Sequence, residues 1–332
     1  MKLKILTFNH HEAFLSLLSQ SGFDFDLVEQ KGSLDLHWNP SAPPRPANMS
    51  PVYFDKNLRK NLREGYYDVV ICHTIKNLIW MMPFRNNRFI FVAHIHLFRK
   101  SYRDKIKAWL KKLIYHLFSF THNCQLIAVT HSKLLSWDTA GQVIVNVPGC
   151  RTAPEPSGAD QQTEMKEPQV HPVIFVSNDM QRRGDEAGYQ VIRFLAKQLA
   201  LTVIGHNPGF PGAIIPGNYS QFCSAFRQGK IYVFPVRPPF DEFNLAMLEA
   251  MSMGMPVVCF EHPHSPVIHD VNGLIAHSTE EMLRHLKFLL NHPQECIRLG
   301  KAARQTIETQ FSQAEFVRKW VAACQVRAQS IS

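Results

Sequence analysis

The stretch that decides the fold is Val233–Val258, which reads VFPVRPPFDEFNLAMLEAMSMGMPVV. It opens within a short apolar run, Ile231–Phe234, of the kind that forms buried parallel strands. An Arg-Pro-Pro sequence then breaks the strand into a loop, and an apolar stripe at helical spacing begins at Asn244. Gly254 ends this helix before the next apolar run. The stretch therefore predicts a strand, loop, helix, strand unit, which is typical of α/β proteins.

Two acids, Asp241 and Glu249, lie where this loop meets the helix, with seven residues between them. The first amides of the helix, at 243–245, form a site for an anion, most often a phosphate. Glu249 lies about one and a half turns into the helix. From there it can accept hydrogen bonds from ribose hydroxyls, while Asp241 can reach an uncharged polar part of the same ligand. The alternative is that Asp241 is an ordinary N-terminal acid and Glu249 a solvated helix residue.

This stretch resembles the motif of retaining glycosyltransferases of the GT-B fold, family four. The motif has two acids separated by seven residues, then a Gly-x-Pro-Val end, and the residues that match it are Phe243, Leu245, Leu248, Glu249, Ala250, Met251, Gly254, Pro256, Val257 and Val258. The resemblance implies an α/β GT-B fold, with two Rossmann-like, doubly wound domains facing across a cleft. It also implies transfer of a sugar from a nucleotide-diphospho-sugar, the co-substrate, to an acceptor hydroxyl with retention. Neither a metal nor another cofactor is implied.

The resemblance assigns roles to the residues of this junction. Glu249 binds the ribose. Asp241 aligns with the acid that contacts the donor sugar but is one methylene shorter, so that Glu242 is the alternative. Where the family has small glycines, which let the backbone approach the donor, this chain has Glu242 and Asn244. The residues expected around the donor here are Glu242, Phe243, Asn244 and Leu245.

A second donor-binding loop follows the first apolar run of the second half. Here the resemblance places Arg183 on a family lysine and Gly184 on a family glycine, while Asn178 stands where the family has an arginine. The two family cations clamp the donor diphosphate, which an arginine can do in bidentate fashion. Arg182 can replace the missing cation, although an Arg-Arg pair before a helix is often only surface charge. Gly205, after the next apolar run, is implied beside the nucleotide base.

Histidines follow apolar runs in the first half, where doubly wound sheets place ligand sites. The run Phe89–Ala93 is followed by His94 and His96. His94 resembles the family's strand-ending histidine that faces the donor sugar, with His96 as second choice. A zinc site is the alternative, but no paired cysteines or aspartate cluster follow at ligand spacing, so no metal is expected. After the first strand, Asn9 is expected to cap a helix, and the His-His-Glu sequence at 10–12 is either a set of metal ligands or a polar loop.

The segment 99–120 combines two patterns. Its basic residues are Arg99, Lys100, Arg103, Lys105, Lys107, Lys111 and Lys112. Apolar residues recur at helical spacing: Tyr102, Ile106, Trp109, Leu110, Leu113, Leu117 and Phe118. Such a basic amphipathic helix can lie on an anionic membrane surface, as a helix of this region does in membrane-peripheral members of the family resembled. The alternative is a helix packed on the sheet with a solvated basic face.

Composition narrows the classes of protein. With 332 residues, 45% of them hydrophobic and 19% charged, the chain is expected to fold as one large or two medium globular domains. A formal charge of +9 favours acidic partners. The seven cysteines are scattered singly, as expected for reduced thiols in the cytoplasm rather than a disulfide framework. No apolar run approaches ~18–20 residues, so no membrane span is expected, and the first residues read as a strand rather than a signal peptide.

These patterns together predict a domain organisation and a function. Residues 1–150 form an N-terminal acceptor domain, 151–170 a linker and 171–314 the nucleotide-sugar-binding domain, while a C-terminal helix at about 315–332 packs back on the first domain. The acceptor is expected to be a glycan or a lipid-linked molecule of envelope polysaccharide synthesis, at the inner face of the membrane.

Three alternatives compete with this function. A degenerate relative would bind a nucleotide sugar or a membrane without transfer. A nicotinamide-dependent oxidoreductase is disfavoured because no Gly-x-Gly-x-x-Gly follows a strand. Nucleic acid is not expected as a partner because no recognition motif supports it.

Overall fold

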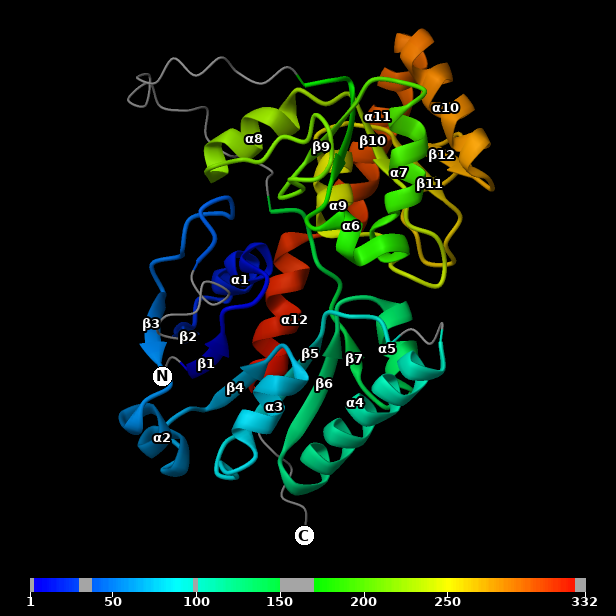
Figure 1. Cartoon of the computed structure of the whole chain (residues 1–332). Helices are drawn as coiled ribbons and strands as arrows, with labels where there is room; N and C mark the ends of the chain where they lie inside the picture. The colour runs from blue at the N-terminus through cyan, green and yellow to red at the C-terminus, as the bar shows by residue number, and fades with distance from the viewer. Residues whose placement is uncertain (1–2, 30–37, 98–100, 150–169, 326–332) are drawn as a thin grey trace. The chain divides into compact units, whose positions relative to one another are not determined.

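The computed structural model describes residues 3–29, 38–97, 101–149 and 170–325 (Figure 1). The chain forms two compact units. Unit 1 comprises Met1–Asn146 and Gln313–Ser332, and unit 2 comprises Val147–Ser312. The linker predicted at 151–170 lies, except for its last residue, outside the described residues. Among the helices described, none combines the length and the apolar character that a bilayer crossing requires.

Unit 1 is built on a seven-stranded sheet in the order β3-β2-β1-β4-β5-β6-β7, in which every pairing is parallel. The strands are β1 Lys4–Phe8, β2 Asp24–Glu29, β3 Met49–Tyr53, β4 Val69–Cys72, β5 Phe89–Ala93, β6 Cys124–Ala128 and β7 Gln142–Val143. β4 and β5 are buried along their whole length, as expected for strands covered on both faces. The strand order reverses between β1 and β4, which marks the switch point where such sheets bind ligands.

The helices of unit 1 are α1 Glu12–Leu18, α2 Lys56–Arg63, α3 Ile75–Met81, α4 Tyr102–Thr121, α5 His131–Trp137 and α12 Gln313–Gln325, with a short 3₁₀ helix η1 at Ser19–Ser21. Four of these helices (α2, α3, α4 and α5) begin at a polar residue whose side chain accepts from a free backbone amide. Thr74 caps α3 and Ser101 caps α4, each in a capping box. The prediction that Asn9 caps α1 is wrong. The Asn9 amide donates to Val28 O and extends the β1–β2 pairing, and His11 stands at the N-cap with a positive φ of 58°.

The last described helix, α12, is part of unit 1. Trp320 is fully buried there, with its ring 5.6 Å from that of Phe14 on α1. The Arg88 guanidinium donates to Cys324 O at 2.9 Å and to Ala323 O at 2.6 Å. A cation that binds the last carbonyls of a helix also interacts favourably with the negative end of its dipole. The side chain of Arg88 therefore anchors the end of α12.

Unit 2 has a five-stranded parallel sheet in the order β12-β11-β10-β8-β9. Its strands are β8 Val173–Val176, β9 Leu201–Ile204, β10 Ile231–Phe234, β11 Val257–Phe260 and β12 Gly273–Ala276. The helices are α6 Met180–Arg183, α7 Tyr189–Ala196, α8 Tyr219–Arg227, α9 Leu245–Ser252, α10 Thr279–Asn291 and α11 Pro293–Gln310, with a 3₁₀ turn η3 at Gly184–Ala187. The predicted strand, loop, helix, strand unit is confirmed as β10, α9 and β11. The switch point lies between β8 and β10.

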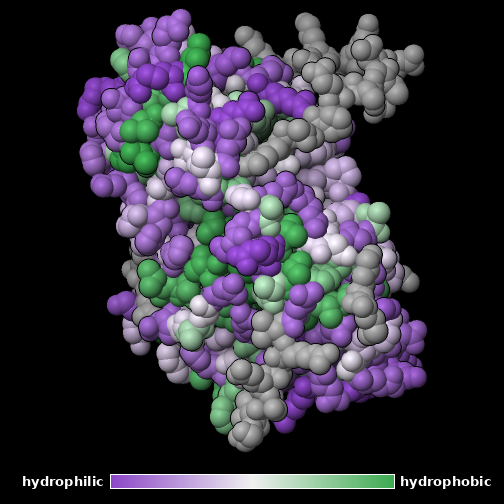
Figure 2. Space-filling model, turned by 180° about the vertical axis from the view of Figure 1, so that it is seen from behind, coloured by the Kyte–Doolittle hydropathy of each residue, from purple (hydrophilic) through white to green (hydrophobic). Residues whose placement is uncertain are grey.

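The two sheets keep apolar side chains inside each unit. Strands β10 and β11 are buried at every position, and hydrophilic residues cover much of the molecular face seen in Figure 2. The structure confirms the prediction of an α/β fold with two parallel sheets.

A close helix contact holds α9 in place. Gly254 follows α9 with a φ of 79°, a left-handed conformation that glycine adopts without strain. Gly300 on α11 faces it, and a Cβ atom on Gly300 would lie 1.9 Å from the Gly254 carbonyl oxygen. Position 300 must therefore be glycine for α11 to approach the end of α9, the helix that carries Glu249.

Replacing Gly300 by alanine should lower the free energy of unfolding, although alanine is the better helix former by roughly 1 kcal/mol. The added methyl group would overlap the Gly254 carbonyl, and overpacking of this kind costs ~1–3 kcal/mol. Denaturant unfolding measures the change, with Lys301→Ala at the exposed neighbouring position as control. A variant as stable as the wild type would contradict the close approach of the two helices.

Candidate active site

The loops at the carboxyl end of the unit 2 sheet are packed together by two glycines. Gly205, which follows β9, has a φ of 129°, and a Cβ atom there would lie 2.4 Å from Ser177 O in the loop after β8. Gly188 has a φ of 62°, and its Cβ atom would lie 2.6 Å from Pro235 O at the end of β10. Both contacts exclude a side chain. The loop after β8 therefore lies against the ends of both β9 and β10, at the switch point.

The loop after β8 contains the predicted phosphate-binding residues. Arg183 is exposed, and its Nη1 donates to Ser177 Oγ at 3.4 Å. Arg182 forms an ion pair with Asp179 at 3.2 Å, and the hydrogen bonds from Arg182 and His206 lower the pKa of Asp179. Because Arg182 is already paired with a carboxylate, Arg183 is the better placed of the two to meet a ligand phosphate.

Two further predicted residues of this loop have structural roles. The Asn178 carboxamide oxygen accepts from the His206 amide at 2.7 Å, so this side chain ties the loop after β8 to the loop after β9. Gly184 has a φ of 59°, and a Cβ atom added there would meet no other atom within 4 Å. Its backbone conformation rather than crowding therefore favours glycine.

The acids of the deciding stretch are less exposed than an ordinary loop or helix surface. Glu242 is 2% exposed and Glu249 is 6% exposed, whereas Asp241 is partly exposed. The alternative that Glu249 is a solvated helix residue is therefore wrong. Neither Asp241 nor Glu242 caps α9, because the Asn244 side chain accepts from the Met247 amide at 2.8 Å. Burying a carboxylate costs free energy unless the carboxylate is hydrogen-bonded or paired. Acids held in such an environment are therefore candidates for a functional site.

Two further residues, which were not predicted from the sequence, lie beside these acids in the structure. His262 follows β11 and is buried, and its Nε2 donates to Val236 O at 2.9 Å. Burial lowers the pKa of His262, while that carbonyl, Glu242 and Asp241 act in the opposite direction. Tyr232, inside β10, lies near Asn244 and Glu249, and burial raises its pKa. His262 could have been found from its position after a strand, but nothing in the sequence singles out Tyr232.

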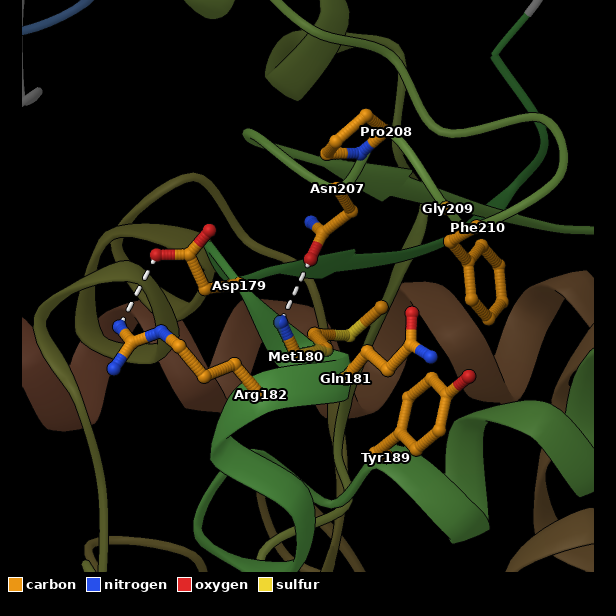
Figure 3. A pocket seen from close by; sticks show the side chains of 9 residues that line it. All are labelled: Asp179, Met180, Gln181, Arg182, Tyr189, Asn207, Pro208, Gly209 and Phe210. Carbon is orange, nitrogen blue, oxygen red and sulfur yellow. Dashed lines mark hydrogen bonds and ion pairs between the residues drawn. The ribbon is translucent and has the colours of Figure 1, made fainter.

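A pocket of about 350 Å³ opens beside the loop after β8 (Figure 3). It is lined by Asp179, Met180, Gln181, Arg182, Tyr189, Asn207, Pro208, Gly209 and Phe210. The Asn207 side chain shapes its floor by accepting from the Met180 amide at 2.9 Å and donating to Ser177 O at 2.6 Å. The aromatic rings of Tyr189 and Phe210 lie on the same side of this pocket in Figure 3. The sequence assigns no role to these aromatic residues, because no motif marks them.

Four histidines gather at the switch point of the unit 1 sheet. His10 and His11 follow β1, His73 follows β4 and His94 follows β5. His73 Nδ1 lies 3.0 Å from His94 Nε2, and the His10 and His11 rings lie 5.6 and 4.8 Å from the His94 ring. The predicted sugar contact, His94, is therefore one member of a cluster.

Burial lowers the pKa values of three histidines of the cluster, His10, His73 and His94. Burial, with like charge from His10 and His11, lowers the pKa of His73 well below its usual value. The pKa of His94 is lowered by burial and by His11, His73, His10 and Lys133. Within the four described ranges, no group of three or more His, Cys, Asp or Glu side chains is arranged to hold a metal ion.

The predicted residues thus fall into two groups. One group lies in unit 2, in the segments that follow β8, β9 and β10 or on α9: Asn178, Arg182, Arg183, Gly184, Gly205, Asp241, Glu242, Phe243, Asn244, Leu245 and Glu249. Phe243 packs on Phe311, with ring centroids 6.1 Å apart. His94 lies in unit 1.

Several solved structures share this arrangement of helices and strands. HepE from Anabaena, solved with UDP-glucose, matches with a TM-score of 0.69 and 12% identity, over 97% of this chain and 99% of that one. Sucrose-phosphate synthase from Thermosynechococcus elongatus matches with a TM-score of 0.66 and 14% identity, over 97% and 98%. TarM from S. aureus, solved with UDP, matches with a TM-score of 0.57 and 16% identity, over 78% and 55%. At these identities the likeness establishes the fold.

Part of the amino-acid sequence matches a known protein family. No curated protein matches this chain. Residues 188–292, which include β9, β10, α9 and β11, match the family described as glycosyl transferases group 1. This segment contains both predicted acids of the deciding stretch. The chain has the fold of the GT-B glycosyltransferases that it resembles, and residues 188–292 of its second unit match the glycosyl transferases group 1 family.

Proposed function

We propose that this protein is a glycosyltransferase that moves a sugar from a nucleoside-diphosphate sugar to an acceptor hydroxyl with retention, and that unit 2 binds the donor. The observation that carries the proposal is the burial of two carboxylates, Glu242 in the loop before α9 and Glu249 within α9, in the segment that matches the family. The solved complexes of HepE with UDP and UDP-glucose support a uridine nucleotide as the first donor to test.

The diphosphate would be bound by positive groups at the switch point. Arg183 is exposed and can present a planar, bidentate guanidinium. The N-terminal turn of α9 supplies amides and the positive end of a helix dipole. The Asn244 side chain occupies one of these amides, that of Met247, so the remaining amides of the first turn are the ones available to a phosphate. These groups would also stabilise the charge that develops on the leaving diphosphate.

The acids would position the two sugars of the donor. Glu249 is assigned to the ribose hydroxyls. Asp241 is assigned to the transferred sugar, because it is the more exposed of the two acids in the preceding loop. Glu242, buried near His262, would then support this loop rather than contact the sugar. His94 of unit 1 is assigned to the donor sugar.

The acceptor is proposed to be a glycan or lipid-linked molecule reached at an anionic membrane surface, on which α4 would lie. Only Ala108, Tyr115 and Phe118 of this helix are buried. The opposite side exposes an apolar stripe that includes Trp109, 59% exposed, and Phe120, 90% exposed. One side of α4 thus packs in unit 1, and the opposite side, which is apolar and flanked by lysines, supports the proposed contact with a membrane. Such a face suits the interface of an anionic bilayer.

Glu249→Gln should weaken binding of UDP-glucose by roughly 10- to 100-fold. The amide keeps the shape of the side chain but loses charge-assisted hydrogen bonds to the ribose, which are worth ~1.5–3 kcal/mol. Calorimetric titration of the donor measures the change. Glu308→Gln, on the exposed side of α11, is the matched control. Equal affinity of Glu249→Gln and the wild type would remove Glu249 from the site.

Arg183→Ala should weaken binding of UDP more than Arg182→Ala does. Arg182 is paired with Asp179, whereas the guanidinium of Arg183 is bonded to a neutral hydroxyl. A charge-assisted contact to phosphate is worth ~1.5–3 kcal/mol, so the expected loss for Arg183→Ala is about tenfold or more. Titration with UDP alone separates this effect from sugar contacts. A larger loss of UDP affinity in Arg182→Ala than in Arg183→Ala would contradict this assignment and indicate that Arg182 binds the diphosphate.

Lys105→Glu with Lys107→Glu should reduce sedimentation with vesicles that contain phosphatidylserine. Each basic residue near an anionic surface contributes ~1 kcal/mol, and the substitutions also add repulsion. Lys112 is left unchanged because it is paired with Asp138 at 3.6 Å. The control is Lys287→Glu with Lys301→Glu in unit 2, which makes the same change in net charge at exposed positions. Binding that falls equally in both double variants, or in neither, would argue against docking through α4.

A further inference from the structure

A chain of hydrogen bonds crosses three neighbouring strands of unit 1. Thr7 Oγ1 on β1 lies 2.8 Å from His73 Nε2, and His73 Nδ1 lies 3.0 Å from His94 Nε2. The strands β1, β4 and β5 are adjacent in the sheet, so each of the three side chains comes from its own strand or strand end. The His73 backbone is also fixed, because its amide donates to Asn77 Oδ1 at 3.0 Å.

The burial of Thr7 shows which atom donates in the hydrogen bond between Thr7 and His73. Thr7 is completely buried, and within the described part of the chain its hydroxyl has a single hydrogen-bond partner, His73 Nε2. If His73 donated its Nε2 proton, the threonine hydroxyl hydrogen would be left without an acceptor. An unmet buried donor costs ~1–3 kcal/mol. Thr7 therefore donates and His73 Nε2 accepts.

The positions of the ring protons on His73 and His94 follow if both imidazoles are neutral. A neutral imidazole carries one N–H, so His73, which accepts at Nε2, carries its proton on Nδ1 and donates it to His94 Nε2. His94 in turn accepts at Nε2 and carries its proton on Nδ1. No other hydrogen bond to the His94 ring is present among the described residues, so this N–H is available to a ligand.

We propose that His73 is a positioning residue that holds His94 in the Nδ1-protonated tautomer, so that His94 presents a hydrogen-bond donor at the switch point of the unit 1 sheet. This inference rests on the proposed contact between His94 and the donor sugar. A fixed donor would select a sugar oxygen that can accept, and it leaves His94 without a lone pair to act as a base. The role resembles that of other groups that fix a histidine tautomer through its second ring nitrogen.

The charged and titratable groups around His94 also favour its neutral form. His10 and His11 from the loop after β1, His73 from β4 and Lys133 from α5 all disfavour a positive charge on His94. A doubly protonated His94 would have no acceptor nitrogen for His73, and the chain of hydrogen bonds would break. These four groups therefore favour the neutral form of His94, which is the form that can accept the hydrogen bond from His73.

Nuclear magnetic resonance of protein labelled with ¹⁵N-histidine at pH 7.5 tests the tautomers directly. In the wild type, His73 and His94 should both show the Nδ1–H form. Thr7→Val removes the hydroxyl at nearly constant volume, so His73 loses its fixed direction and His94 should become a mixture of tautomers. Thr7→Ser restores the hydroxyl and should restore the single form. An Nε2–H form of His94 in the wild type, or an unchanged His94 in Thr7→Val, would overturn the inference.

Calorimetry separates this inference from the proposed function. Thr7→Val should bind UDP-glucose about fivefold more weakly than the wild type, the effect of one neutral hydrogen bond of ~1 kcal/mol. UDP, which lacks the sugar, should bind both proteins equally. If the wild type binds neither ligand, the proposed donor is wrong, while the tautomers still test the positioning role. If UDP-glucose binds both proteins equally and the tautomer is unchanged, the positioning role fails while the proposed function stands.

Discussion

The structure depends on close backbone approach at the carboxyl ends of parallel strands. In unit 2, Gly205 lets the loop after β9 touch the loop after β8, and Gly188 lets η3 touch the end of β10. Gly300 lets α11 reach the end of α9. Each contact leaves no room for a Cβ atom, and together they fix the loop of Arg183 and the helix of Glu249 around one switch point. The position of the candidate site is therefore set by backbone packing before any polar side chain is considered.

The two units use this sheet end differently. In unit 2 it gathers buried carboxylates and exposed arginines, an arrangement that can bind hydroxyls and phosphates side by side. In unit 1 it gathers histidines. Burial lowers the pKa values of His73 and His94, and hydrogen bonds run from Thr7 through His73 to His94. The unit 2 sheet end therefore concentrates charged side chains, whereas the environment of the unit 1 sheet end favours uncharged imidazoles. A site for a charged diphosphate and a site for an uncharged sugar would differ in this way.

Much of the fold could be predicted from the sequence. Buried parallel strands read as apolar runs, and Asn244 and Gly254 mark the two ends of α9. The sequence could not show that β3 pairs with β2, because Pro51 interrupts a weakly apolar run, and an edge strand tolerates proline. It suggested Asn9 as a helix cap, but the competing β1–β2 pairing uses that backbone. Local propensity was overridden there by the sheet.

Where a residue follows a strand or matches a motif, its place in the fold was predictable from the sequence, as for His94, Arg183 and Glu249. Burial was not predictable, and the sequence left open whether Glu249 is solvated. The partnerships that depend on the fold, between His73 and His94 or between Arg182 and Asp179, were also out of reach. His262 and Tyr232 were missed because only the sheet brings β10 and β11 beside α9.

The central claim is that the switch point of unit 2 binds the diphosphate of a sugar nucleotide. A crystal structure of the protein with UDP tests it most directly. We predict electron density for the diphosphate between the Arg183 guanidinium and the first turn of α9, with the ribose hydroxyls at hydrogen-bonding distance from Glu249. A nucleotide bound elsewhere on the chain, or a diphosphate that contacts neither Arg183 nor α9, would contradict it.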